Sequence, residues 1–409
     1  MAKILHTADW HLGKRLQEFS RIEEQKHVLE EIVEIADREN VDLVLLAGDV
    51  YDTYNPTHEA VDLFYKTLRK LSKGGARPVI VISGNHDSTQ FIEAPDPLAR
   101  QMGILFYSKH DTIVPVGELN ENLFISRSKP GFIEITGNRF SDPVRIILAP
   151  YANEVLLKTY LGEGDREASF RDLMAAKWKI LAEAYCDSAG INLFLGHFFF
   201  MNEGAKPEPE PESERPILHV GGTQALFTHL LPSQLQYAAL GHLHRYHAVS
   251  QTPCPVVYAS SPLSYSFSEA DQQKQVVIIE ATAGKPVSYR PIPLTKGKPL
   301  HRKTFENLEK AVGWLQAHPD TYVELTYATE YAIDAATRKA LLGAHDGIVN
   351  LIPLIRSGGE GQNTGLQVED LEKDMVTLFN MYYHSEKGHE PNPETVELFR
   401  EIIGQNHEA

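Results

Sequence analysis

The first third of the chain alternates short apolar runs with longer stretches in which apolar residues recur at helical spacing. Apolar runs lie at 4–5, 41–47 and 78–83. Between them, residues 28–36 and 61–71 place apolar side chains on one face of an amphipathic helix. This alternation predicts an α/β fold in which helices flank a sheet.

Local signals predict where the first helices begin and end. Ser20 and Glu23 match a capping box ahead of the first helix. Asn55 and Pro56 predict the start of the second helix, and Gly74 its end. Further along, a helix is expected at 170–181, and strands are expected at VRIILAP, INLFLGH, LQYAALGHLH, PVVYAS and QVVIIE.

The amino-acid composition changes at two places in the second half of the chain. The stretch AKPEPEPESERP (205–216) alternates proline with glutamate and predicts an extended, solvated loop. A compositional boundary near 291–303 precedes a strand at 321–328 and a helix at 334–344. We therefore expect a main domain at 1–290, a small α+β domain at 291–356, and a linker with two helices (368–382 and 393–403) at 357–409.

Composition narrows the class of protein. With 409 residues, 42% hydrophobic and 23% charged, the chain is ordinary globular protein. Cys186 and Cys254 are the only cysteines, which excludes a disulfide framework and a cysteine-rich zinc site. No apolar run has the length of a membrane span, and the N-terminus lacks the apolar core of a signal peptide, so a cytoplasmic protein without a membrane partner is expected.

The net charge of −16 counts against a protein that coats nucleic acid by bulk attraction. It leaves room for an enzyme that acts on phosphodiesters, because bound metal ions supply local positive charge. The sequence contains no GxxxxGK[ST] motif, so nothing in it indicates that this chain binds ATP by itself.

Five apolar runs end in polar side chains that suit a metal. In four of the five, a glycine immediately precedes the polar group, as expected where a strand leaves a sheet. Ligands of α/β proteins bind at the carboxyl ends of strands, so the five ends are expected to converge. The residues are Asp9 and His11; Asp49 and Asp52; Asn85, His86 and Asp87; His197; and His242 and His244.

Imidazole and carboxylate ligands suit divalent manganese, iron or zinc. In extended chain, Asp9 and His11 point the same way, as do His242 and His244. The set exceeds what one ion needs and predicts two, with Asp49 as the candidate bridge. Each pair alone is more simply explained as turn, cap or surface hydrogen-bonding residues; the five coincidences together favour a metal site.

In this order, the motifs DxH, GDxxD, GNHD, GH and GHxH resemble the calcineurin-like metallophosphoesterase superfamily. The resemblance implies a β-sandwich with flanking helices and two metal ions. His86 would stand beside the phosphate as acid or charge stabiliser, with Asp87 orienting it. One ion would be held by Asp9, His11, Asp49 and His244, and the other by Asp49, Asn85, His197 and His242.

Longer stretches, HTADWHLGK, AGDVYDT, SGNHDS, GHLHR and YASSPLSYSFSE, are similar to the DNA nucleases of this superfamily that work with a coiled-coil ATPase subunit. This resemblance implies an exonuclease and endonuclease that processes DNA ends and hairpins in repair and recombination, usually with manganese. It also implies a homodimer within a heterotetramer. The α+β unit would be a capping domain that places DNA, and the tail helices would dock on the ATPase.

The expected chemistry is direct hydrolysis by water activated between two ions, without a covalent enzyme intermediate. A phosphatase or cyclic-nucleotide phosphodiesterase on the same metal core is the alternative enzyme, and the core motifs alone do not separate the two. A non-catalytic scaffold that binds DNA or the ATPase is a third interpretation; the complete ligand set speaks against it.

Overall fold

In the computed structural model the described residues are 1–121, 123–152, 166–217, 225–330, 332–355 and, towards the C-terminus, 376–380, 383, 391, 395–396 and 399. The expected tail helices at 368–382 and 393–403 therefore lie largely outside the described residues. The chain divides into two units, one of Met1–Tyr327 and Ile333–Pro353, the other of Ala328–Ala332 and Leu354–Ala409. The two large sheets and the candidate site belong to the first unit.

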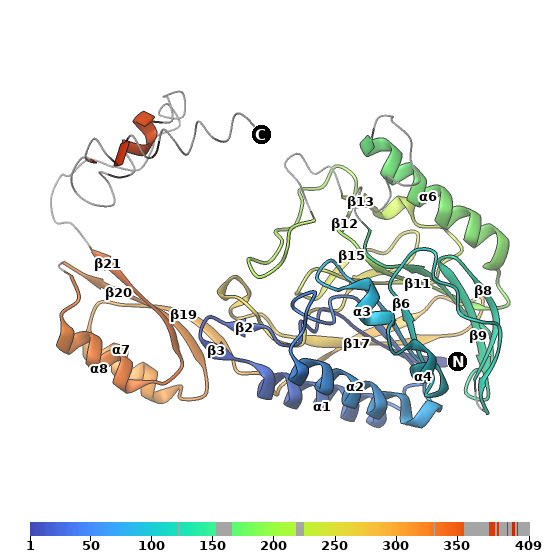
Figure 1. The fold of residues 1–409 in the computed structure, drawn as a ribbon, viewed down its shortest axis with the longest axis horizontal. Coiled ribbons are helices and arrows are strands. Elements are labelled where there is room, and N and C mark those ends of the chain that lie inside the picture. The colour runs from blue at the N-terminus through green and yellow to red at the C-terminus, as the bar shows by residue number, and fades with distance from the viewer. Residues whose placement is uncertain are drawn as a thin grey trace. The chain divides into compact units, whose positions relative to one another are not determined.

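The first sheet is mostly parallel and has helices on its outer face (Figure 1). Helices α1 (Ile22–Arg38) and α2 (His58–Ser72) connect its parallel strands and bury their apolar stripes against it. The strand order is β18 (Ser288–Pro293), β17 (Gln275–Ala281), β1 (Ala2–Thr7), β4 (Leu43–Ala47), β5 (Val79–Ile82) and β6 (Ile104–Tyr107).

The second sheet has a parallel centre flanked by antiparallel strands. Helix α6 (Arg166–Tyr185) covers its outer face through a core that includes Trp178 and Phe194. The strand order is β15 (His247–Ser250), β16 (Val256–Tyr258), β14 (Tyr237–Gly241), β11 (Ile191–His197), β10 (Val144–Ala149), β9 (Phe132–Gly137), β8 (Leu123–Lys129) and β7 (Gly117–Asn120).

The inner faces of the two sheets share one hydrophobic core. Ile4 and Leu45 from the first sheet lie in the same buried cluster as Leu193 and Val257 from the second. The strands at the centre of each sheet are buried on both faces, which is why their sequences are continuous apolar runs. The predicted α/β sandwich with flanking helices is confirmed.

The first two helices begin at positions other than those that the capping signals in the sequence predict. Helix α1 begins at Ile22 without a side-chain cap, so the expected capping box of Ser20 and Glu23 does not form. Helix α2 begins after Thr57, whose side chain accepts a hydrogen bond from the Ala60 N–H at 3.3 Å. The cap of α2 is therefore one residue beyond the predicted Asn–Pro start.

Short elements fill the loops between the main strands. They are β2 (Arg15–Leu16), β3 (Phe19–Ser20), α3 (Thr89–Glu93), α4 (Asp96–Gln101), β12 (Phe200–Met201) and β13 (Leu226–Phe227), with single 3₁₀ turns at Lys73–Gly75, Thr228–Leu230 and Phe267–Glu269.

The α+β unit is a three-stranded sheet with two helices. Its elements are β19 (Leu300–Phe305), α7 (Leu308–Ala317), β20 (Tyr322–Thr329), α8 (Ala335–Ala344) and β21 (Ile348–Ile355). The strand order is β19-β20-β21. The expected strand at 321–328 and helix at 334–344 are confirmed. The expected domain boundary at 290/291 falls inside β18, which continues the first sheet to Pro293.

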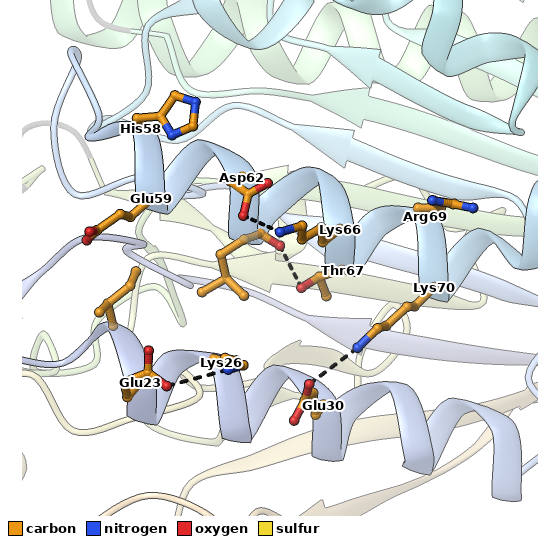
Figure 2. A pocket seen from close by; sticks show the side chains of 12 residues that line it. Glu23, Lys26, Glu30, His58, Glu59, Asp62, Lys66, Thr67, Arg69 and Lys70 are labelled. Atoms are coloured by element: carbon orange, nitrogen blue, oxygen red, sulfur yellow. Dashed lines mark hydrogen bonds and ion pairs between the residues drawn. The ribbon is translucent and has the colours of Figure 1, made fainter.

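A charged groove runs between α1 and α2 on the outer helical layer (Figure 2). Lys70 crosses it to Glu30 at 3.3 Å, while Lys66 pairs with Asp62 along α2 at 2.6 Å. None of the predicted site residues lines this groove. Among the described residues, no helix is both long enough and apolar enough to cross a membrane.

Candidate metal centre

The carboxyl ends of five parallel strands, three in one sheet and two in the other, bring the predicted site residues together. They follow β1, β4 and β5 in the first sheet, and β11 and β14 in the second. Every one of them is buried, although their side chains are polar. These residues are Asp9, His11, Asp49, Asn85, His86, Asp87, His197, His242 and His244.

The backbone at these strand ends is strained in a way typical of functional sites. Asp9, His11, Asp49 and His242 have positive φ angles of 53°, 41°, 48° and 109°, which non-glycine residues rarely adopt. The chain at Asp9 and His11 is therefore not the extended segment that the spacing predicts. At Gly84 a Cβ atom would overlap the Asp49 carboxylate. Glycine is required here because the ligand and the neighbouring chain approach so closely.

One group of ligand atoms gathers around His11 and His244. The two Nε2 atoms face each other at 3.0 Å. The Asp49 Oδ2 atom lies 3.6 Å from His11 Nε2. Three donor atoms that follow β1, β4 and β14 thus converge on one point.

A second group gathers around His197. Its Nε2 atom lies 2.8 Å from Asn85 Oδ1 and 3.3 Å from Asp49 Oδ2. Its Nδ1 atom donates a hydrogen bond to the Ala47 carbonyl at 2.8 Å, which fixes the ring and turns Nε2 inward. Asp49 Oδ2 therefore contacts both groups, as a bridging carboxylate must.

The donor set fits divalent cations. Within the part of the chain that the structure describes, Asp9 Oδ2, Asp49 Oδ2 and His242 Nδ1 are buried and have no hydrogen-bond partner. Leaving buried polar atoms unpaired costs free energy, of the order of 1–3 kcal/mol each. A cation that coordinates these oxygen and nitrogen atoms would remove this cost, and carboxylate with imidazole is a common donor set for such ions.

Negative charge in the centre raises the pKa of His197 and His244, whereas burial lowers the pKa of His11 to about 4. Burial opposes the charged form, but the Asp49 and Asp9 carboxylates raise the pKa of His197 to about 10. Burial is likewise outweighed at His244, where Glu269 and Glu214 raise the pKa to about 10. At neutral pH and without metal, protons therefore compensate the carboxylates, and a metal ion must displace them.

A buried ion pair lies behind His244. Glu269 Oε1 is 3.3 Å from His244 Nδ1, and Lys274 Nζ is 2.6 Å from Glu269 Oε2. A carboxylate behind a ligating histidine fixes the ring and raises its basicity. Both residues lie outside the strand-end motifs, so no sequence signal singles them out.

The side chains of His86 and Asp87 make different contacts. The Asp52 carbonyl oxygen, 2.9 Å from His86 Nδ1, holds the His86 ring, so Nε2 faces the centre. The Asp87 carboxylate accepts hydrogen bonds from the backbone N–H groups of Val50, Tyr51 and Gly84 at 3.1, 3.0 and 2.8 Å. Asp87 therefore ties two loops together, and the expected orienting contact with His86 comes from Asp52 instead.

Two glutamates from the 205–216 stretch enter the centre, contrary to the predicted solvated loop. Glu214 Oε1 lies 2.7 Å from His86 Nε2, and Glu210 Oε1 lies 2.6 Å from His242 Nε2. Burial alone would raise the pKa of Glu214, but hydrogen bonds from His11, His244 and His86 hold it well below its usual range. A proline- and glutamate-rich composition is typical of exposed loops, so it carries no signal for this contact.

Comparison with known proteins agrees with this geometry. A model of the family "Calcineurin-like phosphoesterase" matches residues 2–246. The SbcD subunit of the nuclease SbcCD from Bacillus subtilis (strain 168) is 31% identical over 409 residues, which covers 98% of this chain and 97% of that protein. The proteins of the same name from Rhodobacter capsulatus and Staphylococcus epidermidis are 32% and 30% identical; they cover 73% of this chain, and 71% and 70% of their own lengths.

Proposed function

Since the chain belongs to the calcineurin-like phosphoesterases and, among them, to the SbcD nuclease subunits, we propose that it hydrolyses phosphodiester bonds at DNA ends and hairpins during DNA repair and recombination. It is a metal-dependent nuclease. One observation carries the proposal: ligands from five strand ends of two sheets converge on a buried centre, in a chain related to a nuclease along nearly its whole length.

The centre would hold two divalent ions, and manganese is the ion we propose. Asp9, His11, Asp49 and His244 would hold one, and Asp49, Asn85, His197 and His242 the other. When bound, the two ions activate water and neutralise charge on the phosphate. The residues around the ligands orient them. Bulk water is excluded from the centre because the proposed ligands are all buried.

His86 would act as the acid beside the leaving sugar oxygen. Its Nδ1 is occupied by the Asp52 carbonyl, which leaves Nε2 to face the phosphate. Burial opposes the charged form, but hydrogen bonding to Glu214 and the Asp49 carboxylate raise the pKa of His86. The raised pKa favours the protonated ring, which can donate its proton to the leaving group.

The proposed partners are DNA and an SbcC-type ATPase, with two copies of this chain in a heterotetramer in the cytoplasm. The name of the relatives, as members of the nuclease SbcCD, supports the ATPase partner. The α+β unit would place DNA over the centre, and the residues after 356 would dock on the partner. The alternative is a phosphatase that acts on small substrates. Such an enzyme would need neither a unit that places DNA nor a segment that docks on a partner.

The deciding assay compares substrates. The purified chain with manganese is given linear DNA, hairpin DNA and a generic phosphate ester, each with and without an SbcC-type partner. Cleavage of both DNA substrates is expected, with hairpin opening stimulated by the partner and ATP. Ester hydrolysis without DNA cleavage under any of these conditions would overturn the nuclease proposal.

A further inference from the structure

The proline- and glutamate-rich segment 205–217 (the PE segment) places one buried carboxylate over the metal centre. Within 205–216, Glu214 is the one buried residue, with 7% of its surface exposed. Its neighbours Arg215 and Pro216 are exposed. A charged side chain at the tip of an otherwise solvated segment is buried only if strong partners receive it.

Those partners lie on both sides of the centre. Glu214 Oε1 accepts hydrogen bonds from Asn85 Nδ2 at 2.9 Å and His86 Nε2 at 2.7 Å. Glu214 Oε2 lies 2.9 Å from His244 Nε2 and 3.2 Å from His11 Nε2. Oε2 thus contacts the first group of ligand atoms, and Oε1 lies 3.9 Å from His242 Nδ1 of the proposed second ligand set.

A substrate phosphate has the same requirements. Its non-bridging oxygens must face both ions and must lie within reach of His86. A carboxylate and a phosphodiester are both oxygen anions, so they repel each other and cannot fill this position together. We propose that Glu214 is an internal ligand of the metal centre that occupies the phosphate position, so that the PE segment closes the centre until substrate displaces it.

The segment is held by polar contacts that water can replace. Glu210 Oε1 lies 2.6 Å from His242 Nε2 and also accepts a hydrogen bond from the Ile217 N–H at 2.7 Å. Lys14 Nζ donates to the Ser213 carbonyl at 2.9 Å. Hydrogen bonds to charged groups such as these contribute about 1.5–3 kcal/mol each, so the phosphodiester must gain more than this from the two ions to displace the segment.

The proposal rests on the proposed function for the identity of the ligands, and it is tested without DNA cleavage. Inorganic phosphate is titrated calorimetrically into the manganese-loaded full chain, for wild type, Glu214→Gln and the control Glu212→Gln. Glu212 is exposed on the same segment. If the open form is about one tenth of the population, Glu214→Gln binds phosphate about tenfold more tightly than wild type, and Glu212→Gln binds like wild type.

Manganese titration of the same three proteins distinguishes an obligatory metal ligand at position 214 from a carboxylate that only occupies the phosphate position. Equal ion stoichiometry is expected, because Glu214 occupies the substrate position in addition to a complete ligand set. Loss of an ion in Glu214→Gln would overturn the proposal, since Glu214 would then be an obligatory ligand. Equal phosphate affinity in all three proteins would overturn it as well.

Hydrogen exchange gives a readout on the unaltered chain. Saturating phosphate should accelerate amide exchange in the PE segment of the manganese-loaded wild type, because the segment is displaced. Unchanged exchange under saturating phosphate would contradict the displacement. A chain that passes these tests but cleaves no DNA loses the nuclease proposal alone, whereas an active nuclease that fails them loses only the role of Glu214.

Discussion

His86 is held at one ring nitrogen and presents the other to the metal centre. Under the proposed ligand sets, which leave His86 out, its chemistry would be separate from metal binding. The residues around His86 have distinct contacts: Asp52 contacts the His86 ring through its carbonyl oxygen and pairs with Lys14 through its carboxylate, and the Asp87 carboxylate binds backbone N–H groups of the loops. A substitution at one of these residues should therefore change one property of the site, such as acid catalysis or metal binding, and leave the others unchanged.

Replacing His86 should remove the acid and leave the metals. We expect His86→Asn to lower kcat for DNA cleavage about 10²–10⁴-fold, the usual contribution of a general acid. Manganese affinity, measured by calorimetry, should remain within about twofold of wild type. Full activity in a metal-loaded variant would remove His86 from the reaction.

Metal affinity should increase with pH. Because Asp49 and Asp9 raise the pKa of His197 to about 10, this ring holds a proton at neutral pH. An ion must displace that proton, so the apparent affinity should rise by about tenfold per pH unit for each proton released, until the pH approaches 10. Manganese calorimetry at pH 6.5, 7.5 and 8.5, in buffers of different ionisation enthalpy, measures the proton count. Binding without proton release would contradict the expectation.

Glu269 should act through His244. Glu269→Gln removes the charge behind the ligating ring, and outer carboxylates of this kind typically contribute 10–100-fold in metal affinity. We expect manganese affinity to fall by about tenfold or more, measured well below the unfolding temperature. Ser268→Ala, at the adjacent position, is the control and should bind manganese like wild type. Equal affinity in both variants would leave Glu269 with a structural role only.

At the scale of elements, the decisive feature is that strand ends from two sheets meet. Strands β4 and β5 carry Asp49 and Asn85 at their ends, and β11 brings His197 from the opposite sheet. The contact between the sheets is close enough that a Cβ at Gly241 would overlap the Ala47 carbonyl. The ligands are therefore held by rigid strands, and small backbone changes at their ends should be costly.

Gly84→Ala should disrupt the centre. The added methyl group overlaps the Asp49 carboxylate, and overpacking of this kind costs about 1–3 kcal/mol. We expect a lower melting temperature and weaker manganese binding than in wild type. Gly313→Ala is the matched control, because Gly313 lies in α7 with open space around its Cα. It should be neutral or stabilising by about 0.5–1 kcal/mol.

At the scale of the molecule, the α+β unit is joined to the nuclease part by apolar and polar contacts. Leu300 and Tyr322 pack with Leu16 and Phe267, and the Tyr322 hydroxyl donates to Glu24 Oε1 at 2.9 Å. These contacts include none of the proposed metal ligands, so the proposed DNA-positioning role of the unit can be tested without changing a ligand. DNA, which is large, should depend on this contact more than a small ester does.

Tyr322→Ala tests this dependence. The variant should lower DNA cleavage several-fold while hydrolysis of a small phosphate ester remains unchanged. Tyr322→Phe is the matched control, since it keeps the ring and loses one hydrogen bond, a change of about 1 kcal/mol. Equal loss of both activities in Tyr322→Ala would place the effect in the metal centre and contradict a DNA-positioning role.

The sequence pattern by itself determined the α/β class and the candidate metal ligands, while the sandwich was implied by the resemblance of its motifs to a known family. Buried parallel strands must be continuous apolar runs, and a ligand at a strand end must follow such a run, often after a glycine. Both facts are local, so VDLVLLAGD and YAALGHLH carry them in their own residues. The helix cap expected at Ser20 is also a local signal, but it failed because Ser20 belongs to β3 and Arg21 stands at the N-cap position of α1.

The tertiary structure alone decided which distant residues reach the centre. Glu214, Glu269 and Lys274 belong to loops whose composition is that of ordinary exposed chain. Their burial depends on where the two sheets place these loops, and no periodicity along the sequence encodes that position. The sequence also could not predict that the Asp52 carbonyl orients His86. Every residue has a backbone oxygen, and only the fold places this one beside the His86 ring.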